Sequence, residues 1–171
     1  MELQIVKFFN RFGKDKIDLA TRIISYIPLL TVFWGLMALA LLFFDRANGL
    51  KILVALALAT IFHFAITEGI FKILLAKNFT RVRPYVAFPD EIKPLGKKHR
   101  DSSFPSSHMS STLAMLTVAT LFVPVIWPAA LLFTLFMAYA RLHNGMHYPS
   151  DIIAGTVLGI VYGTLAVYLV R

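Results

Sequence analysis

The sequence contains no cysteine and few charged residues. The absence of cysteine excludes disulfides, thiolate metal sites and thiol nucleophiles throughout the 171 residues. Only 15% of the residues are charged, whereas 58% are apolar. A water-soluble domain of this length normally carries more charge. The shortage of charge therefore predicts an integral membrane protein.

Acidic residues are scarcer than basic ones, with 9 Asp and Glu against 17 Lys and Arg, for a net charge of +8. In a water-soluble protein this excess would suggest a nucleic-acid partner. Here the basic residues flank apolar runs, and no nucleic-acid-binding motif is present. We therefore expect anionic membrane lipids, or a phospholipid or phosphoglycolipid substrate, as partners. The sequence indicates no nucleic-acid partner and no obligate protein partner.

Long apolar runs predict an all-α bundle of about five transmembrane helices. Each run approaches the roughly 20 residues that cross a bilayer core of about 30 Å. The expected spans cover about residues 23–44, 52–75, 105–123, 129–141 and 150–170. Residues 1–171 are expected to form a single integral membrane domain.

The first 16 residues place apolar side chains such as Val6 and Phe9 against basic ones such as Lys7 and Lys14. This helical periodicity predicts an amphipathic helix at the membrane interface, and an ordinary charged flank is the alternative. If the spans alternate in direction, the loops 77–104 and 142–149 lie on the same face as this helix. A connection as long as 77–104 is typical of a functional loop.

Two polar clusters belong to that long loop and its end. The first contains Lys77, Arg81 and Arg83, whose fixed cations suit a phosphate group. The second, Ser106-Ser107-His108, follows a proline and marks a helix start, where free N–H groups bind anions. A histidine beside an anion site can serve as a general acid. The structural alternatives are a membrane-anchoring flank and a simple helix cap.

The third cluster contains Arg141, His147 and Asp151. The carboxylate is placed to accept the Nδ1–H of His147, which would leave Nε2 as a nucleophile. Arg141 would neutralise charge that develops on phosphate oxygens. A salt bridge at the membrane interface is the structural alternative.

In order, Lys…Arg-Pro, Pro-Ser-x-His and Arg-x5-His-x3-Asp resemble the motifs of the type 2 phosphatidic acid phosphatase (PAP2) superfamily. Its membrane members are lipid phosphate phosphatases, and vanadium haloperoxidases share the site. The resemblance, which covers residues 77–151, implies a hydrolase of phosphoric esters or diphosphates that needs no metal and no cofactor. It implies that His147 forms a phosphohistidine, that His108 protonates the leaving oxygen and that Asp151 orients His147. The implied phosphate ligands are Lys77, Arg83, Ser106, Ser107 and Arg141, with Arg81 as an alternative to Lys77.

Three positions depart from the family pattern. The family lysine usually lies seven residues before the arginine, where this chain has Ala76, so that Lys77 is one residue late. Ser107 replaces the usual glycine before the acid histidine, and Ala140 replaces the serine that commonly precedes the arginine of the third motif.

The absence of an inserted domain makes the chain similar to the branches that act on lipid A 1-phosphate or undecaprenyl diphosphate. Lipid A 1-phosphate is the leading expectation, while undecaprenyl diphosphate, phosphatidylglycerol phosphate and phosphatidic acid remain open. The resemblance implies a multi-pass protein of the bacterial inner membrane with a periplasmic active site. The positive-inside rule instead assigns the basic face to the cytoplasm, so the two indications of sidedness disagree.

Two other functions are compatible with the residues. A haem-binding membrane subunit would use His63, His108, His143 or His147 as ligands. A metal hydrolase would use His108 and His147 together with Asp151.

Two patterns within the spans remain. Glu68 and Lys72 in the second span are either a functional pair or residues that snorkel to the interface. Glycines at positions 155, 159 and 163 predict close packing of the fifth span against Ser110 and Ala114 of the third. Such packing would bring His108 and His147 to a shared phosphate.

Overall fold

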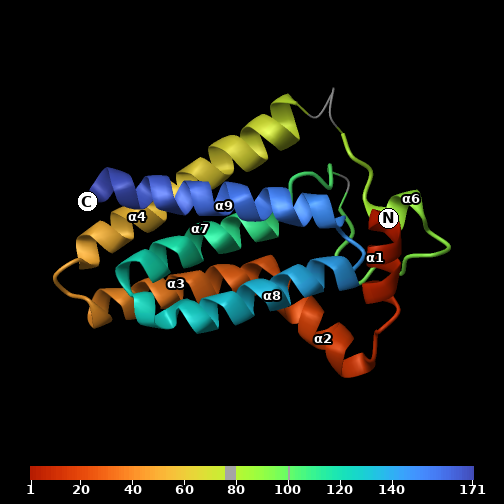
Figure 1. The fold of residues 1–171 in the computed structure, drawn as a ribbon, viewed down its shortest axis with the longest axis horizontal. Helices are drawn as coiled ribbons and strands as arrows, with labels where there is room; N and C mark the ends of the chain where they lie inside the picture. The colour runs from red at the N-terminus through yellow and green to blue at the C-terminus, as the bar shows by residue number, and fades with distance from the viewer. Residues whose placement is uncertain (76–79, 100) are drawn as a thin grey trace.

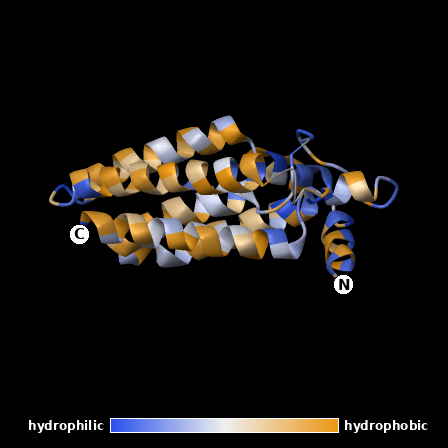
Figure 2. Ribbon diagram, turned by 90° about the horizontal axis from the view of Figure 1, so that it is seen from above, coloured by the Kyte–Doolittle hydropathy of each residue, from blue (hydrophilic) through white to orange (hydrophobic). Residues whose placement is uncertain are grey.

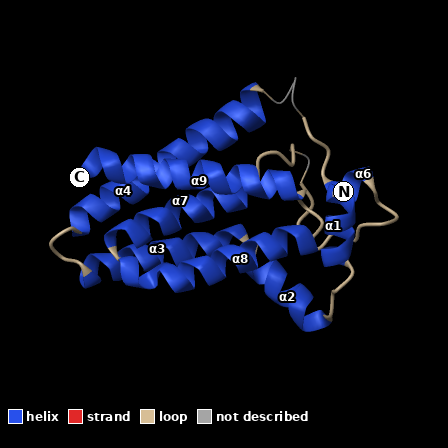
Figure 3. Ribbon diagram, viewed as in Figure 1, coloured by secondary structure: helices blue, strands red, loops and turns tan. Residues whose placement is uncertain are grey.

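A computed structural model describes residues 1–75, 80–99 and 101–171, and its described part contains helices and loops but no strand (Figure 3). The all-α prediction is therefore confirmed. The elements in chain order are α1 (Glu2–Asn10), α2 (Asp15–Ile24), α3 (Ile27–Phe44), α4 (Gly49–Phe62), η1 (His63–Leu74), α6 (Pro84–Ala87), α7 (Ser107–Phe122), η2 (Pro124–Ile126), α8 (Trp127–His143) and α9 (Pro149–Val170).

The long helices run side by side, and the short helices α1, α2 and α6 gather at one end with the N-terminus (Figure 1). The C-terminus lies at the opposite end. Hydrophobic residues cover the long helices, whereas hydrophilic residues concentrate around the loops at the N-terminal end (Figure 2). This separation is the one expected of a bundle that spans a bilayer and carries a polar site at one face.

Among the described residues, four segments are long and apolar enough to cross a membrane: Ile27–Phe44, Gly49–Leu74, Pro124–His143 and Pro149–Val170. They correspond to four of the five predicted spans. The remaining one, predicted over residues 105–123, is α7, which has 16 residues and is the most buried of the long helices. It packs against α4, α8 and α9, and its central place explains why it can be shorter and more polar than its neighbours.

The N-terminal region differs from the prediction of one amphipathic helix over residues 1–16. The chain forms two helices, α1 and α2, separated by a break that includes Gly13. The predicted first span also begins too early, because Tyr26 is extended and Pro28 starts the new helix α3. Apolar side chains such as Phe8, Phe12 and Leu19 remain exposed, as expected at a membrane interface.

Hydrogen bonds hold both α1 and α2 against the end of α8. The Nδ1 and Nε2 atoms of His143 lie 2.9 Å from the Phe9 carbonyl and 2.8 Å from the Asp18 carboxylate. The side-chain amide of Asn10 donates to the His143 carbonyl at 2.6 Å. The N-terminal segment therefore closes the bundle on the side of the polar loops.

The glycine row on α9 packs closely against α7, as predicted. A Cβ atom at Gly155 would lie 2.5 Å from the Ser106 carbonyl oxygen, and one at Gly159 would lie 2.5 Å from that of Ser110. At Gly163 the corresponding distance to the Ala114 carbonyl oxygen is 2.7 Å. No larger side chain fits without moving the helices apart, so these glycines fix the spacing of α7 and α9.

Candidate active site

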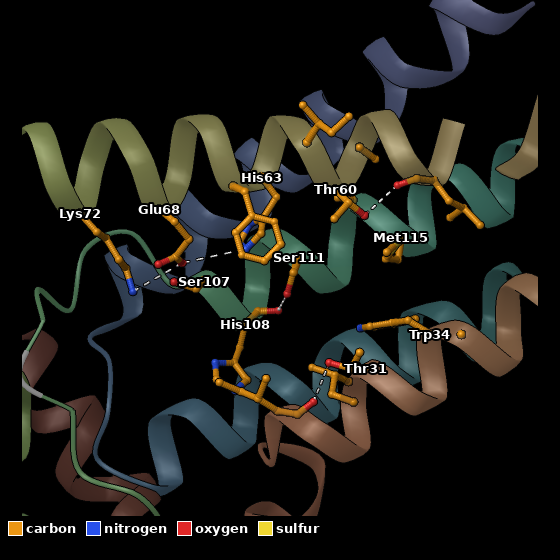
Figure 4. Close-up of a pocket in the computed structure, with 18 of the residues that line it drawn as sticks. Thr31, Trp34, Thr60, His63, Glu68, Lys72, Ser107, His108, Ser111 and Met115 are labelled. Atoms are coloured by element: carbon orange, nitrogen blue, oxygen red, sulfur yellow. Dashed lines mark hydrogen bonds and ion pairs between the residues drawn. The ribbon is translucent and has the colours of Figure 1, made fainter. Parts of the chain in front are cut away.

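A cavity of about 850 Å³ begins among polar side chains at the loop end and continues into the bundle (Figure 4). The polar residues that line it toward the loops come from η1, the position before α6, the loop after α6, the start of α7, the end of α8 and the loop before α9. They include Lys72, Arg83, His99, Asp101, Ser107, His108, Arg141 and His147. Residues from all three predicted clusters therefore meet in one place.

His147 lies at the back of this site and is 1% exposed. Its Nδ1 atom is 2.8 Å from the Ser103 carbonyl oxygen, which can only accept a hydrogen bond. Nδ1 therefore carries the proton, and the lone pair belongs to Nε2, which faces Nη1 of Arg83 at 3.4 Å. Burial and the nearby charges of Arg141 and Arg83 lower the pKa of His147 well below 6.5. The ring is thus held neutral, with Nε2 available as a nucleophile.

The predicted hydrogen bond from His147 to Asp151 is wrong. The Asp151 carboxylate lies 3.8 Å from Nδ1 of His147 and instead accepts the backbone N–H of Tyr148 at 2.8 Å. The reason is its position in the first turn of α9, where a carboxylate folds back to cap the helix. Asp151 therefore holds the turn that carries His147, and the Ser103 carbonyl orients the ring.

Arg81, considered as a phosphate ligand, lies behind the cavity. Its guanidinium donates to Asp151 at 2.7 Å and to Glu2 at 2.6 Å, and it covers the Tyr148 ring at 4.1 Å. Glu2 also accepts the N–H of Ser150 at 2.9 Å. Through these contacts Arg81 connects α1 to the start of α9.

Lys77 lies outside the described residues, and a lysine that the sequence analysis assigned to no site lines the cavity. The ammonium group of Lys72 is 2.8 Å from Oδ2 of Asp101 and 4.0 Å from Glu68, and its side chain is 7% exposed. Lys72 therefore does not snorkel out of the protein, and it adds a cation to the cavity wall.

Asp101, also missed by the sequence analysis, holds two cations in position. Its Oδ1 accepts from Arg83 at 3.0 Å while Oδ2 accepts from Lys72. Burial raises the pKa of Asp101, but the hydrogen bond and charge of Lys72 and those of Arg83 outweigh it and lower the pKa to about 2. The carboxylate therefore stays ionised and fixes the two cations at the cavity wall. No sequence motif marks it.

Arg141 is buried without a counter-ion. It is 3% exposed, its Nε atom has no hydrogen-bond partner, and in the part of the chain that the structure describes no carboxylate lies within ion-pair distance of it. The hydroxyls of Ser106 and Ser107 are likewise buried without partners. The first N–H groups of α7 lie beside them and lack intrahelical acceptors. An unpaired buried cation is costly, so this arrangement suits an anion.

His108, which follows Ser107 at the start of α7, also lines the cavity and is 8% exposed. Its Nε2 atom lies 3.0 Å from the Ser25 carbonyl oxygen and therefore donates to it. A proton for a leaving group must then come from Nδ1, so the predicted acid role requires the ring to carry two protons.

His99 is a further residue that the sequence analysis missed. It lines both the main cavity and a second one of about 450 Å³, which Arg22 and Lys97 also line. Burial and the charge of Arg83 lower the pKa of His99. Arg141 borders both cavities, so the anion site is also approached from the loop side.

The geometry bears on the other functions considered. Within residues 1–75, 80–99 and 101–171, no three His, Asp or Glu side chains form a group that could hold a metal ion. Of the histidines considered for haem, His143 engages the Phe9 carbonyl and Asp18, and His63 engages Ser110 at 3.0 Å.

Comparisons with known proteins identify relatives of this chain. The chain is 28% identical over 145 residues to the lipid A 1-phosphatase of Rhizobium johnstonii, a match that covers 82% of this chain and 59% of that protein. It is 33% identical over 94 residues to undecaprenyl-diphosphatase BcrC of Bacillus subtilis, covering 54% of this chain and 47% of that protein. The chain thus spans about half the length of these curated relatives.

The fold is similar to the crystal structure of LpxE from Aquifex aeolicus, with a TM-score of 0.69 and 22% identity, over 98% of this chain and 94% of that one. A sequence profile described as the PAP2 superfamily matches residues 48–171, which include the cavity-lining residues from η1 to α9. The chain belongs to the PAP2 superfamily.

Proposed function

We propose that this protein is a metal-independent lipid phosphatase that works through a phosphohistidine on His147. The observation that carries the proposal is the unpaired, buried Arg141 beside the start of α7, close to a histidine whose Nε2 lone pair faces the same cavity. A phosphate group would supply the missing anion. The apolar part of the cavity would receive the lipid chain.

In the first step, Nε2 of His147 forms a bond to phosphorus and the bond from phosphorus to the lipid oxygen breaks. Arg83, Arg141 and Lys72 stabilise the negative charge on the other phosphate oxygens. His108, carrying two protons, gives the one on Nδ1 to the leaving lipid oxygen. In the second step, His108 takes a proton from water as the water oxygen bonds to phosphorus and the phosphohistidine bond breaks. Inorganic phosphate leaves, and both histidines return to their starting states.

Lipid A 1-phosphate is the substrate we propose first, because a relative named lipid A 1-phosphatase aligns with 82% of this chain. Undecaprenyl diphosphate and phosphatidylglycerol phosphate are the alternatives. We further propose the bacterial inner membrane as the location, with the site at the periplasmic face. Labelling of single cysteines introduced at positions 49 and 97 tests the sidedness.

The experiment is phosphate release from a panel of these lipids by purified protein in excess chelator, with His147→Asn as the comparison. Asparagine keeps an N–H donor for the Ser103 carbonyl but has no nucleophilic nitrogen. We expect release by the wild type only, and a phosphorylated protein that is stable in alkali and labile in acid. Equal activity of the two proteins, or activity that chelator abolishes, would contradict the proposal.

A further inference from the structure

The inner part of the cavity is a groove between α3, α4 and α7 that leads from the phosphate site into the membrane-spanning region (Figure 4). Apolar residues such as Leu30, Leu56, Phe64, Ala114 and Met115 line it. Such a surface suits a hydrocarbon chain and gives no reason for a polar group. One buried polar group in it nevertheless lacks a hydrogen-bond partner in the described part of the chain.

The indole N–H of Trp34 is that group. Trp34 is 8% exposed, lines the groove, and its Nε1 atom is buried without a hydrogen-bond partner in the described part of the chain. In Figure 4 Trp34 lies across the groove from Met115. The ring is fixed by Phe33 and Phe133, whose ring centroids lie 4.8 and 5.5 Å away. A buried donor without a partner is rare in folded proteins and calls for an explanation.

The neighbouring hydroxyls do not remove the need for an acceptor. Thr31, Thr60 and Ser111 line the groove too, but each donates its proton to a carbonyl of its own helix, at 3.0, 2.8 and 3.3 Å. None of them is within hydrogen-bond distance of Trp34. The indole therefore presents a donor to whatever occupies the groove.

The position of this donor indicates which part of a lipid it meets. Trp34 follows Ile27, the first residue of α3, by seven residues, or about 10 Å. Side chains on a helix lean toward its N-terminus, so the indole reaches back toward the phosphate end. An acceptor held there lies just beyond the phosphate ester, where acylated lipids carry ester or amide carbonyls. A polyprenyl chain has only carbon at that point.

We propose that Trp34 Nε1–H donates a hydrogen bond to an acyl carbonyl oxygen of the substrate, and that it is a specificity-determining residue for acylated over polyprenyl phosphates. This inference rests on the proposed phosphatase function. It narrows the substrate class to lipids whose chains are attached through an ester or amide. A polyprenyl phosphate in the same groove would leave the indole unpaired, and such a loss produces strong discrimination between substrates.

The test measures phosphate release by the wild type and by Trp34→Phe from three detergent-dispersed substrates. These are dioleoyl phosphatidic acid, its dialkyl ether counterpart without carbonyls, and farnesyl phosphate. We expect the wild type to favour the ester over the ether by about tenfold in kcat/KM, the effect of one hydrogen bond. Trp34→Phe should lose about tenfold on the ester and less than about twofold on the other two. Trp127→Phe, which changes a 60% exposed tryptophan outside the groove, is the matched control.

Each outcome decides one point. Equal loss on all three probes, or no ester preference in the wild type, would overturn the role of Trp34 and leave the phosphatase proposal intact. If the wild type releases phosphate from none of the probes or of the lipids named above, the phosphatase proposal itself fails. Activity on farnesyl phosphate and an unchanged melting temperature show that Trp34→Phe is folded.

Discussion

Replacing Gly155 with alanine tests whether the close contact between α7 and α9 positions the active site. The new Cβ atom would lie 2.5 Å from the Ser106 carbonyl oxygen and 3.0 Å from Cβ of Met109. Ordinary contact begins at about 3.4 Å, so α7 and α9 must separate by almost 1 Å here. The carbonyl cannot rotate away, because it accepts the N–H of Ser110 at 3.0 Å within α7.

The separation would move the start of α7 relative to the loop that carries His147. The N–H of Ser106 donates to the Asp151 carbonyl at 3.1 Å, so the two helix starts are joined at this point. A misplacement of about 1 Å can reduce the rate by about 10²-fold. Overpacking of the interface should also cost about 1–3 kcal/mol of stability. We therefore expect a folded but weakened protein with roughly 1% of wild-type kcat.

Gly163→Ala is the matched control. Its Cβ atom would meet Thr117 and the Ala114 carbonyl at 2.6 and 2.7 Å, a similar clash, but about 12 Å further along α9. Phosphate release and melting temperature should be measured for both variants in the same detergent. We expect similar losses of stability but a much larger loss of kcat for Gly155→Ala. Equal losses of kcat, or full activity of Gly155→Ala, would refute the positional argument.

Three further perturbations follow from the site. Lys72→Met should lower kcat/KM by about 10- to 100-fold, the range for a hydrogen bond to a charged group, and an unchanged value would remove Lys72 from the phosphate site. Asp151→Asn places a donor group beside Arg81 and loosens the turn before α9, so kcat should fall about tenfold at constant KM; a rise in KM alone would argue against a positioning role. Because the folded-state pKa of His147 is lowered well below 6.5, its reactive neutral form is lost only as pH falls through that lowered value. As the pH is lowered through 6.5, kcat/KM corrected for the phosphate ionisation near pH 6 should therefore not fall through protonation of His147. A loss of kcat/KM on acidification with a midpoint near 6.5 would contradict this.

Most of the fold could be predicted because the bilayer imposes a simple requirement. Apolar runs near 20 residues mark the spans, and the order of the motifs places their polar residues at one end. The glycines at 155, 159 and 163 predicted the contact with α7 because their spacing of four residues follows the helical repeat. The break between α1 and α2 was less visible, because residues 1–16 keep a helical pattern on both sides of Gly13.

The relation between His147 and Asp151 could not be derived from spacing, although both residues were identified. A spacing of four residues brings side chains together only when all of them belong to one helix. Here α9 begins at Pro149, and Tyr148 is extended, with φ −84° and ψ 161°. His147 therefore lies outside the helix, and its ring turns to the Ser103 carbonyl. The sequence contains no signal for that backbone contact.

Lys72 was considered only together with Glu68, and not with the three polar clusters, because α4 changes its helical geometry after Phe62. Lys72 lies nine positions after His63. In an α-helix, at about 100° per residue, the two side chains would point to opposite faces. Residues His63–Leu74 instead form a π-helix, whose i→i+5 hydrogen bonds widen each turn. As a result His63, Glu68 and Lys72 all line the same cavity. The wider turn thus brings a cation from a membrane-spanning helix to the cavity that also contains Arg83 and Arg141, which the periodicity of an α-helix cannot reveal.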